Sequence, residues 1–197
     1  MWKSMLIGCA VFAATSTQAA NIEVRNDSAW GQRIVIIGPI VLGDAEKFQA
    51  VATPLPDGTP VSLHSQGGLI FTAFNIGTTV QQRHFKTIVT GPSTCVSACS
   101  LIWLSGDHMV VAQGARIGFH RTNVAGKPSK YGDGRVRYYL ARLGWGPTQI
   151  NWFLKTPHTG MHFLNIKEAR DVLHIRFDTV DRGSWRSCDM KFCWLAP

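Results

Sequence analysis

The chain has 197 residues, a formal net charge of +8 and 45% hydrophobic residues. It contains no low-complexity stretch, internal repeat or linker, which excludes a repeat array and argues against separate domains. Lys and Arg are scattered along the sequence and no nucleic-acid-binding motif accompanies them, so the charge predicts a basic surface and no nucleic-acid partner.

The first residues have the pattern of a secretory signal peptide. Lys3 is the only charge before a short apolar run, and small residues follow up to Ala19. The run is too short to span a bilayer, and we predict cleavage after Ala19 or, as a second choice, after Ala20. Lipidation at Cys9, which ends a lipobox-like Leu-Ile-Gly-Cys, and a buried first helix are the alternatives. With residues 1–19 as signal peptide, we expect a periplasmic or secreted protein without stable membrane insertion.

About 178 residues remain after this cleavage, which suits one domain with its own core. In chain order, we predict strands over 33–37, 61–65, 85–89, 109–112, 116–119 and 175–180. Between and after them we predict helices over 44–51, 69–82, 97–104, 133–143, 147–155 and 165–173. This alternation predicts an α/β domain over residues 20–180, with parallel strands, right-handed crossovers and a buried sheet. Residues 181–197 are left as a C-terminal tail.

Four cysteines follow the predicted signal peptide: Cys95, Cys99, Cys188 and Cys193. In an oxidising compartment an even number predicts two disulfides, with three pairings to choose from. Local pairing of Cys95 with Cys99 and of Cys188 with Cys193 needs the least assumed folding. Cross-pairing would instead tie the tail to the centre of the chain, and the sequence leaves both schemes open.

Three features follow predicted strands, which is where α/β folds place their sites. Gly67 and Gly68 form a Gly-Gly turn, which lets backbone N–H groups approach a ligand as an oxyanion hole requires. Ser97 opens a predicted helix within Cys-Val-Ser-Ala-Cys, with the Ala98 N–H as a second donor. His120 ends a strand in Ile-Gly-Phe-His, at a distance that allows a base to return to the hydroxyl. Each feature also has a structural interpretation, as a plain turn, a helix N-cap and a structural histidine.

The order of these motifs resembles the catalytic subunit of the Clp protease and its SppA-type relatives in the ClpP/crotonase superfamily. The resemblance extends over about residues 33–180, and includes Ile-Ile-Gly-Pro-Ile at 36–40 and Phe-Leu-Asn-Ile-Lys-Glu-Ala at 163–169. It implies an α/β fold of repeated ββα units, with a buried, mostly parallel sheet flanked by helices.

The resemblance also implies a chemistry. Ser97 would be the nucleophile and His120 the general base of an acyl transfer. The backbone N–H groups of Gly68 and Ala98 would stabilise the oxyanion, with Gly67 shaping the turn. The substrate would be a peptide or unfolded protein, the protein a homo-oligomer, and neither a cofactor nor a metal is expected.

One family feature is missing. Where the Clp-type pattern has an aspartate, two residues before the Phe of the Phe-Leu segment, this chain has Met161. A Ser-His dyad supported by a backbone carbonyl or another side chain, an SppA-like lysine base and an inactive site are the alternatives. His158 and His162, four residues apart, could share a helix face, but the glutamate of the zinc motif is absent. We predict an exported serine peptidase, with a catalytically silent ClpP-like binding or scaffold protein as the alternative and a crotonase-type acyl-CoA enzyme as a more distant one.

Overall fold

The computed structural model describes residues 19–27, 31–171, 173–174, 178–180, 188–189 and 192–193. The predicted signal peptide, apart from Ala19, and most of the 181–197 tail lie outside these ranges. The helices are α1 (Asp44–Ala52), α2 (Ile70–Gln82), α3 (Ala98–Trp103), α4 (Lys130–Arg142), α5 (Pro147–Phe153) and α6 (Ile166–Asp171). The strands are β1 (Asn21–Asp27), β2 (Gly31–Ile37), β3 (Pro60–His64), β4 (Lys86–Val89), β5 (Thr94–Val96), β6 (Met109–Ala112), β7 (Arg116–Phe119), β8 (Asn123–Val124), β9 (Lys127–Pro128), β10 (His162–Phe163), β11 (Asp178–Val180), β12 (Cys188–Asp189) and β13 (Phe192–Cys193).

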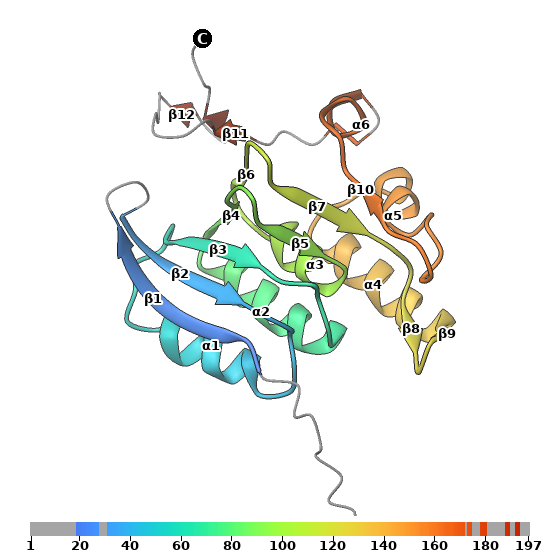
Figure 1. The fold of residues 1–197 in the computed structure, drawn as a ribbon, viewed down its shortest axis with the longest axis horizontal. Helices are drawn as coiled ribbons and strands as arrows, with labels where there is room; N and C mark the ends of the chain where they lie inside the picture. The colour runs from blue at the N-terminus through green and yellow to red at the C-terminus, as the bar shows by residue number, and fades with distance from the viewer. Residues whose placement is uncertain are drawn as a thin grey trace, which may run out of the picture.

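The larger sheet has the order β1-β2-β3-β4-β6-β11, and every neighbouring pair is parallel except the antiparallel edge pair β1–β2. Helices α1, α2 and α3 lie on one side of it (Figure 1). A smaller sheet has the order β10-β7-β5, in which β5 and β7 are parallel and β10 is antiparallel. This confirms the predicted α/β class with a mostly parallel sheet flanked by helices.

The helices pack on the sheet through apolar positions three and four residues apart. In α2 the buried residues include Ala73, Ile76 and Val80, which share one face of a 3.6-residue helix. Gly77 lies on the same face, and a Cβ there would stand 1.9 Å from the Tyr139 hydroxyl of α4. A residue without a side chain therefore lets the two helices approach. Large side chains such as Trp103, Phe48 and Phe85 fill the core, each contributing about 1.5–3 kcal/mol by burial.

The predicted elements agree with the structure except at one helix start, but the edge strand β1 and several short strands were not predicted. β5, β8, β9 and β10 have two or three residues, too few for a periodic pattern, and they exist because a neighbouring strand pairs with them. Helix α4 begins three residues before the predicted start because the Ser129 side chain accepts a hydrogen bond from the Gly132 N–H, at 3.0 Å.

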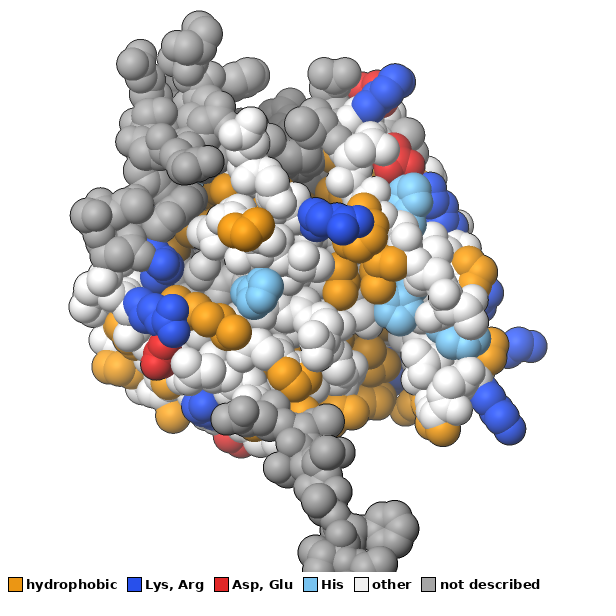
Figure 2. Space-filling model, viewed as in Figure 1, with side chains coloured by type: hydrophobic (Ala, Val, Ile, Leu, Met, Phe, Trp, Pro, Cys, Tyr) orange, Lys and Arg blue, Asp and Glu red, His pale blue; other side chains and the backbone are white. Residues whose placement is uncertain are grey.

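Basic side chains do not form a single patch on the face shown in Figure 2, where they lie in several separate places. None of the helices in the described parts of the chain is long and apolar enough to cross a membrane.

Candidate active site

Ser97 and His120 lie just beyond the ends of two adjacent parallel strands. In the pairing of β5 with β7, Val96 is opposite Gly118, and the Ser97 N–H donates to the Gly118 carbonyl at 3.0 Å. Ser97 directly follows β5 and His120 directly follows β7, so both residues leave the sheet at the same edge. Both line one cavity of about 390 Å³. The structure therefore brings together the two residues that the sequence singled out.

The backbone of Ser97 has an unusual conformation. Its φ is 58° and its ψ is −126°, in the turn between β5 and α3. A positive φ is unfavourable for a residue with a Cβ, and such strained residues cost about 1–3 kcal/mol and cluster at functional sites. Ser97 stands at the N-cap position of α3, yet its hydroxyl makes no capping hydrogen bond. The interpretation of Ser97 as a simple helix N-cap is therefore wrong, because its side chain does not cap.

A disulfide surrounds this turn. Cys95 in β5 and Cys99 in α3 are bonded, with their Cα atoms 5.2 Å apart, and both are fully buried. This confirms local pairing for the first two cysteines and excludes the schemes that join either of them to the tail. Cys188 and Cys193 are opposite each other in the β12–β13 pair. Their side chains lie outside the described residues, so their disulfide stays a prediction.

The Gly67–Gly68 turn packs directly against the serine. A Cβ on Gly67, whose φ is 93°, would stand 2.7 Å from the Ser97 Cβ and 2.9 Å from the Ala98 nitrogen. Gly68 pairs with Ile40 in an isolated bridge, and a Cβ on it would stand 2.0 Å from the Ile40 carbonyl oxygen. Within the described residues, the N–H groups of Gly68 and Ala98 donate no hydrogen bond. Both are therefore available to a carbonyl oxygen beside Ser97, although their role as oxyanion donors stays a prediction.

His120 is half-buried, and its environment favours the neutral ring. Burial lowers the pKa of His120 below its ordinary value; the backbone of Arg121 opposes this shift, and the charge of His158 adds to it. A neutral imidazole at neutral pH is the form that accepts a proton from a serine hydroxyl. The ring Nδ1 is buried and has no hydrogen-bond partner among the described residues.

The structure explains why the position of Met161 matters. β10 is antiparallel to β7, with His162 opposite Phe119, so the same register continued by one residue places Met161 opposite His120. A carboxylate there would face the imidazole. The Met161 side chain instead lies over Gly118, where its sulfur would stand 2.8 Å from an added Cβ. Position 161 therefore has no carboxylate to face His120, as the third member of a Ser-His-Asp triad would.

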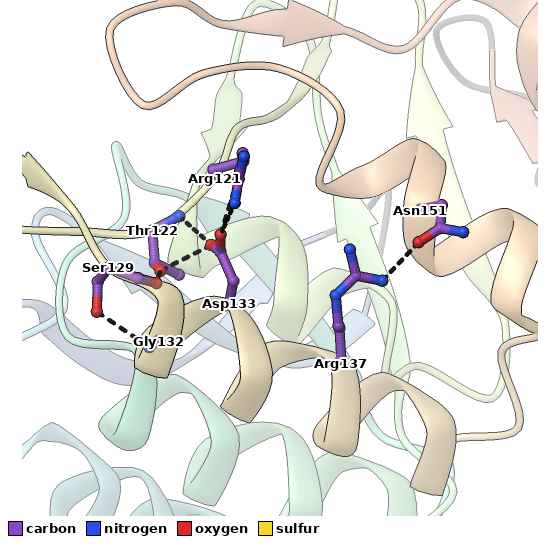
Figure 3. Close-up of polar contacts among 7 residues, drawn as sticks. All are labelled: Arg121, Thr122, Ser129, Gly132, Asp133, Arg137 and Asn151. Atoms are coloured by element: carbon purple, nitrogen blue, oxygen red, sulfur yellow. Dashed lines mark hydrogen bonds and ion pairs between the residues drawn. The ribbon is translucent and has the colours of Figure 1, made fainter.

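A buried carboxylate that no sequence motif indicated lies next to the loop that follows His120. Asp133, in the first turn of α4, bonds to Arg121 and Thr122, the two residues that follow His120 (Figure 3). Its only signal in the sequence is its place at the start of a predicted helix, which gives no indication of a partner in another element.

The hypothesis that His158 and His162 share a helix face is wrong. His162 belongs to β10 and lies 2.8 Å from a Glu168 carboxylate oxygen, whereas His158 lies in a turn with its Nε2 2.9 Å from the Gly126 carbonyl. Among the described residues no cluster of three metal-ligating side chains is found. Among the same residues, none of those that line the cavity is a lysine, so no lysine lies where an SppA-like base would act.

A serine on a strained strand-to-helix turn, beside a histidine, two free N–H groups and a cavity, has features that serine hydrolase sites share. Comparisons with solved structures concern the fold of the chain. Two variants of 1510-N membrane-bound stomatin-specific protease match with a TM-score of 0.55, at 20% and 21% identity, over 75% of this chain and 77% and 73% of theirs. The second of these was solved in complex with a substrate peptide.

A ClpP1 variant from Listeria monocytogenes also matches with a TM-score of 0.55, at 18% identity, over 75% of this chain and 90% of its own. No protein-family model and no curated protein matches the chain. At these identities the likeness concerns the backbone, and it shows that this chain has a ClpP-type α/β fold.

Proposed function

We propose that this protein is an exported serine hydrolase that cleaves peptides by acyl transfer at Ser97. The observation that carries the proposal is the positive φ of Ser97, a residue that lines the same cavity as His120. Non-glycine residues in strained backbone conformations cluster at active sites, where the position of the side chain matters.

Each of these residues has a role in one step of an acyl transfer. The neutral His120 ring takes the proton of the Ser97 hydroxyl as the oxygen attacks the substrate carbonyl carbon. The N–H groups of Gly68 and Ala98 donate to the oxygen that becomes negative. His120 then protonates the leaving amine, and a water molecule, activated by the same ring, releases the acyl group from Ser97.

A peptide is the substrate class that the cavity favours. Its lining includes the buried side chains of Leu101, Phe119 and Phe153, and apolar residues are exposed at its edge: Leu42, Leu69, Phe71, Val124 and Tyr131. Exposed apolar groups around a cavity are typical of a binding surface for apolar segments, which unfolded proteins present. The substrate peptide bound to one structural neighbour supports the same class. A homo-oligomer remains part of the proposal, and native mass spectrometry tests it.

A fluorophosphonate probe tests the proposal, because it reacts with activated serines. Intact mass should show one adduct on the wild-type protein and none on Ser97→Ala. His120→Ala should lower the labelling rate by about 10²–10⁴-fold, the contribution of a general base. Circular dichroism should show that both variants fold. An unlabelled, folded and disulfide-bonded wild type would contradict the hydrolase.

The second candidate is a catalytically silent protein that binds peptides in the same cavity. The observations that favour it are Met161 opposite His120 and the His120 Nδ1 without a partner among the described residues. Binding of an unfolded polypeptide by both wild type and Ser97→Ala, with no adduct on either, would identify this function.

Export is the part of the proposal that concerns the N-terminus. Ala20 is buried, its nitrogen lies 3.4 Å from the buried Asp44 carboxylate, and its carbonyl accepts from Lys47 at 3.0 Å. Cleavage after Ala19 would give this nitrogen a positive charge beside a carboxylate, whereas cleavage after Ala20 would remove a packed residue. Protein recovered from a bacterial periplasm should therefore have the intact mass of a chain that begins at Ala20. Recovery of the unprocessed chain in the cytoplasm would contradict export.

A further inference from the structure

Asp133 is buried, with 5% of its surface exposed, and three hydrogen bonds and an ion pair surround its carboxylate (Figure 3). One oxygen, Oδ2, accepts from the Arg121 Nε at 2.8 Å and lies 2.7 Å from its second guanidinium nitrogen. The other, Oδ1, accepts from the Thr122 N–H at 2.8 Å and lies 2.8 Å from the Thr122 hydroxyl. Both residues belong to the segment that directly follows His120, so a carboxylate of α4 holds the loop that carries the histidine.

The bond to the Thr122 N–H has a geometric consequence. This N–H and the Arg121 carbonyl belong to one planar trans peptide unit, in which they point in opposite directions. A carboxylate that holds the N–H therefore also fixes the direction of the Arg121 carbonyl. The loop is closed further by the Ser129 N–H, which donates to the Thr122 carbonyl at 3.0 Å. This bond holds the next peptide unit, between residues 122 and 123, so two successive peptide units of the loop are fixed.

The backbone of Arg121 interacts with the His120 ring. The interaction of His120 with the Arg121 backbone raises the histidine pKa, as only a hydrogen-bond acceptor would do, and the Arg121 N–H is already donated to Thr156 at 2.8 Å. The ring Nδ1 is buried and makes no hydrogen bond to a described residue. Catalytic hydrogen bonds are often long or bent before substrate binds and shorten in the reacting complex.

We propose that Asp133 is a positioning residue for His120: through the Arg121–Thr122 peptide unit it presents the Arg121 carbonyl to Nδ1, in place of the carboxylate missing at position 161. With Nδ1 protonated and donating to this carbonyl, Nε2 is the nitrogen left to accept the Ser97 proton. The inference rests on the proposed serine hydrolase, because it supplies a group that orients His120 where the third residue of a catalytic triad is missing. Hydrogen bonds in such a chain polarise one another, so the carboxylate strengthens the carbonyl as an acceptor.

The charge of Asp133 is compatible with this role. Burial raises the pKa of Asp133, but the hydrogen bonds from Thr122 and Arg121 and the charge of Arg121 outweigh it and hold the pKa below its usual value. The side chain is therefore ionised at neutral pH. The charged groups that face the loop are Arg121, which pairs with Asp133, and His158, which acts on the His120 ring.

Nitrogen-15 NMR of the ring distinguishes this role from a structural one. In the wild type, two-bond couplings should show His120 as the Nδ1–H tautomer at a pH above its pKa. In Asp133→Asn, which weakens the acceptor for the Thr122 N–H, the ring should become a mixture of tautomers and its pKa should fall. Arg137→Gln is the matched control, because it removes another polar contact of α4, to Asn151, away from the loop; its tautomer and pKa should equal those of the wild type.

Fluorophosphonate labelling across a pH series completes the test. Asp133→Asn should label on the order of tenfold more slowly than wild type, less than the roughly 10²–10⁴-fold contributed by the base itself. The pH midpoint of its labelling should move down with the His120 pKa. A wild-type ring in the Nε2–H tautomer would overturn the inference without any variant. Labelling of Asp133→Asn at the wild-type rate and midpoint would overturn it too. A wild type that shows the Nδ1–H tautomer but no adduct would instead overturn the hydrolase and keep the role of Asp133.

Discussion

The two sides of the cavity are built in different ways. On the serine side, the Cys95–Cys99 disulfide, the Gly67 turn and a hydrogen bond from the Ser97 N–H to β7 hold the backbone. On the histidine side, an ion pair between Arg121 and the buried Asp133 and hydrogen bonds from Thr122 to the same carboxylate hold the loop after His120, and the ring Nδ1 has no hydrogen-bond partner among the described residues. Ser97 is positioned by steric and covalent constraints, and the loop after His120 by polar contacts.

This difference has a physical consequence. A steric or covalent constraint does not depend on pH, and a single added methyl group or a broken bond abolishes it. A polar network responds to every charge in it, so it sets the pKa and orientation of a side chain gradually. We therefore expect changes on the serine side to act mainly on stability and site geometry, and changes on the histidine side to act mainly on titration.

The largest expected effect is that of Gly67→Ala. The added Cβ would stand 2.7 Å from the Ser97 Cβ and 2.8 Å from the Val96 carbonyl oxygen, at a φ of 93°. Overpacking and backbone strain together should lower the free energy of unfolding by roughly 2–5 kcal/mol and abolish labelling of Ser97. Urea denaturation and intact mass measure the two effects.

Gly114→Ala is the matched control for this variant. Gly114 has a similar φ of 81°, but nothing lies within 4 Å of its added Cβ. It should lose only about 1–2 kcal/mol and keep full labelling, since the left-handed conformation is its only penalty. Equal losses for the two variants would show that the contact with Ser97 is not what requires glycine at position 67.

Removal of the disulfide should have an intermediate effect. The Cys95→Ala/Cys99→Ala double variant frees a short loop, for which the chain-entropy relation gives about 2 kcal/mol of lost stability. Labelling of Ser97 should slow, because the turn would relax from its strained conformation. The Cys188→Ala/Cys193→Ala variant, in the tail, should label at the wild-type rate. Unchanged labelling in the Cys95/Cys99 variant would mean that packing alone holds the serine turn.

The smallest expected effect in stability, and the most informative for the histidine side, is that of Met161→Asp. Burial lowers the pKa of His120 in the wild type. A carboxylate opposite His120 favours the charged imidazolium, so the His120 pKa should be higher in this variant. Met161→Asn, polar but uncharged, should produce no comparable rise. NMR titration of the ring measures both, and an unshifted pKa in Met161→Asp would show that position 161 does not face the ring.

Local patterns in the sequence were sufficient for the longer elements and for part of the site. The helical spacing of Ala73, Ile76 and Val80 predicts α2, and the apolar run before Gly38 predicts β2. His120 could be selected because it directly follows a predicted strand, and Ser97 because it opens a predicted helix. The nearness of these two residues required the pairing of β5 with β7, and β5 is too short to be recognised without its partner.

By itself, the sequence determined the fold class and the residue types available for chemistry, because periodicity and turn residues act over a few neighbours along the chain. Only the tertiary structure decided that Cys95 pairs with Cys99, that Met161 stands opposite His120 and that Asp133 reaches the loop after the histidine. These contacts join separate elements, and their existence depends on strand register and helix packing. Neither is encoded in the spacing of the residues that meet.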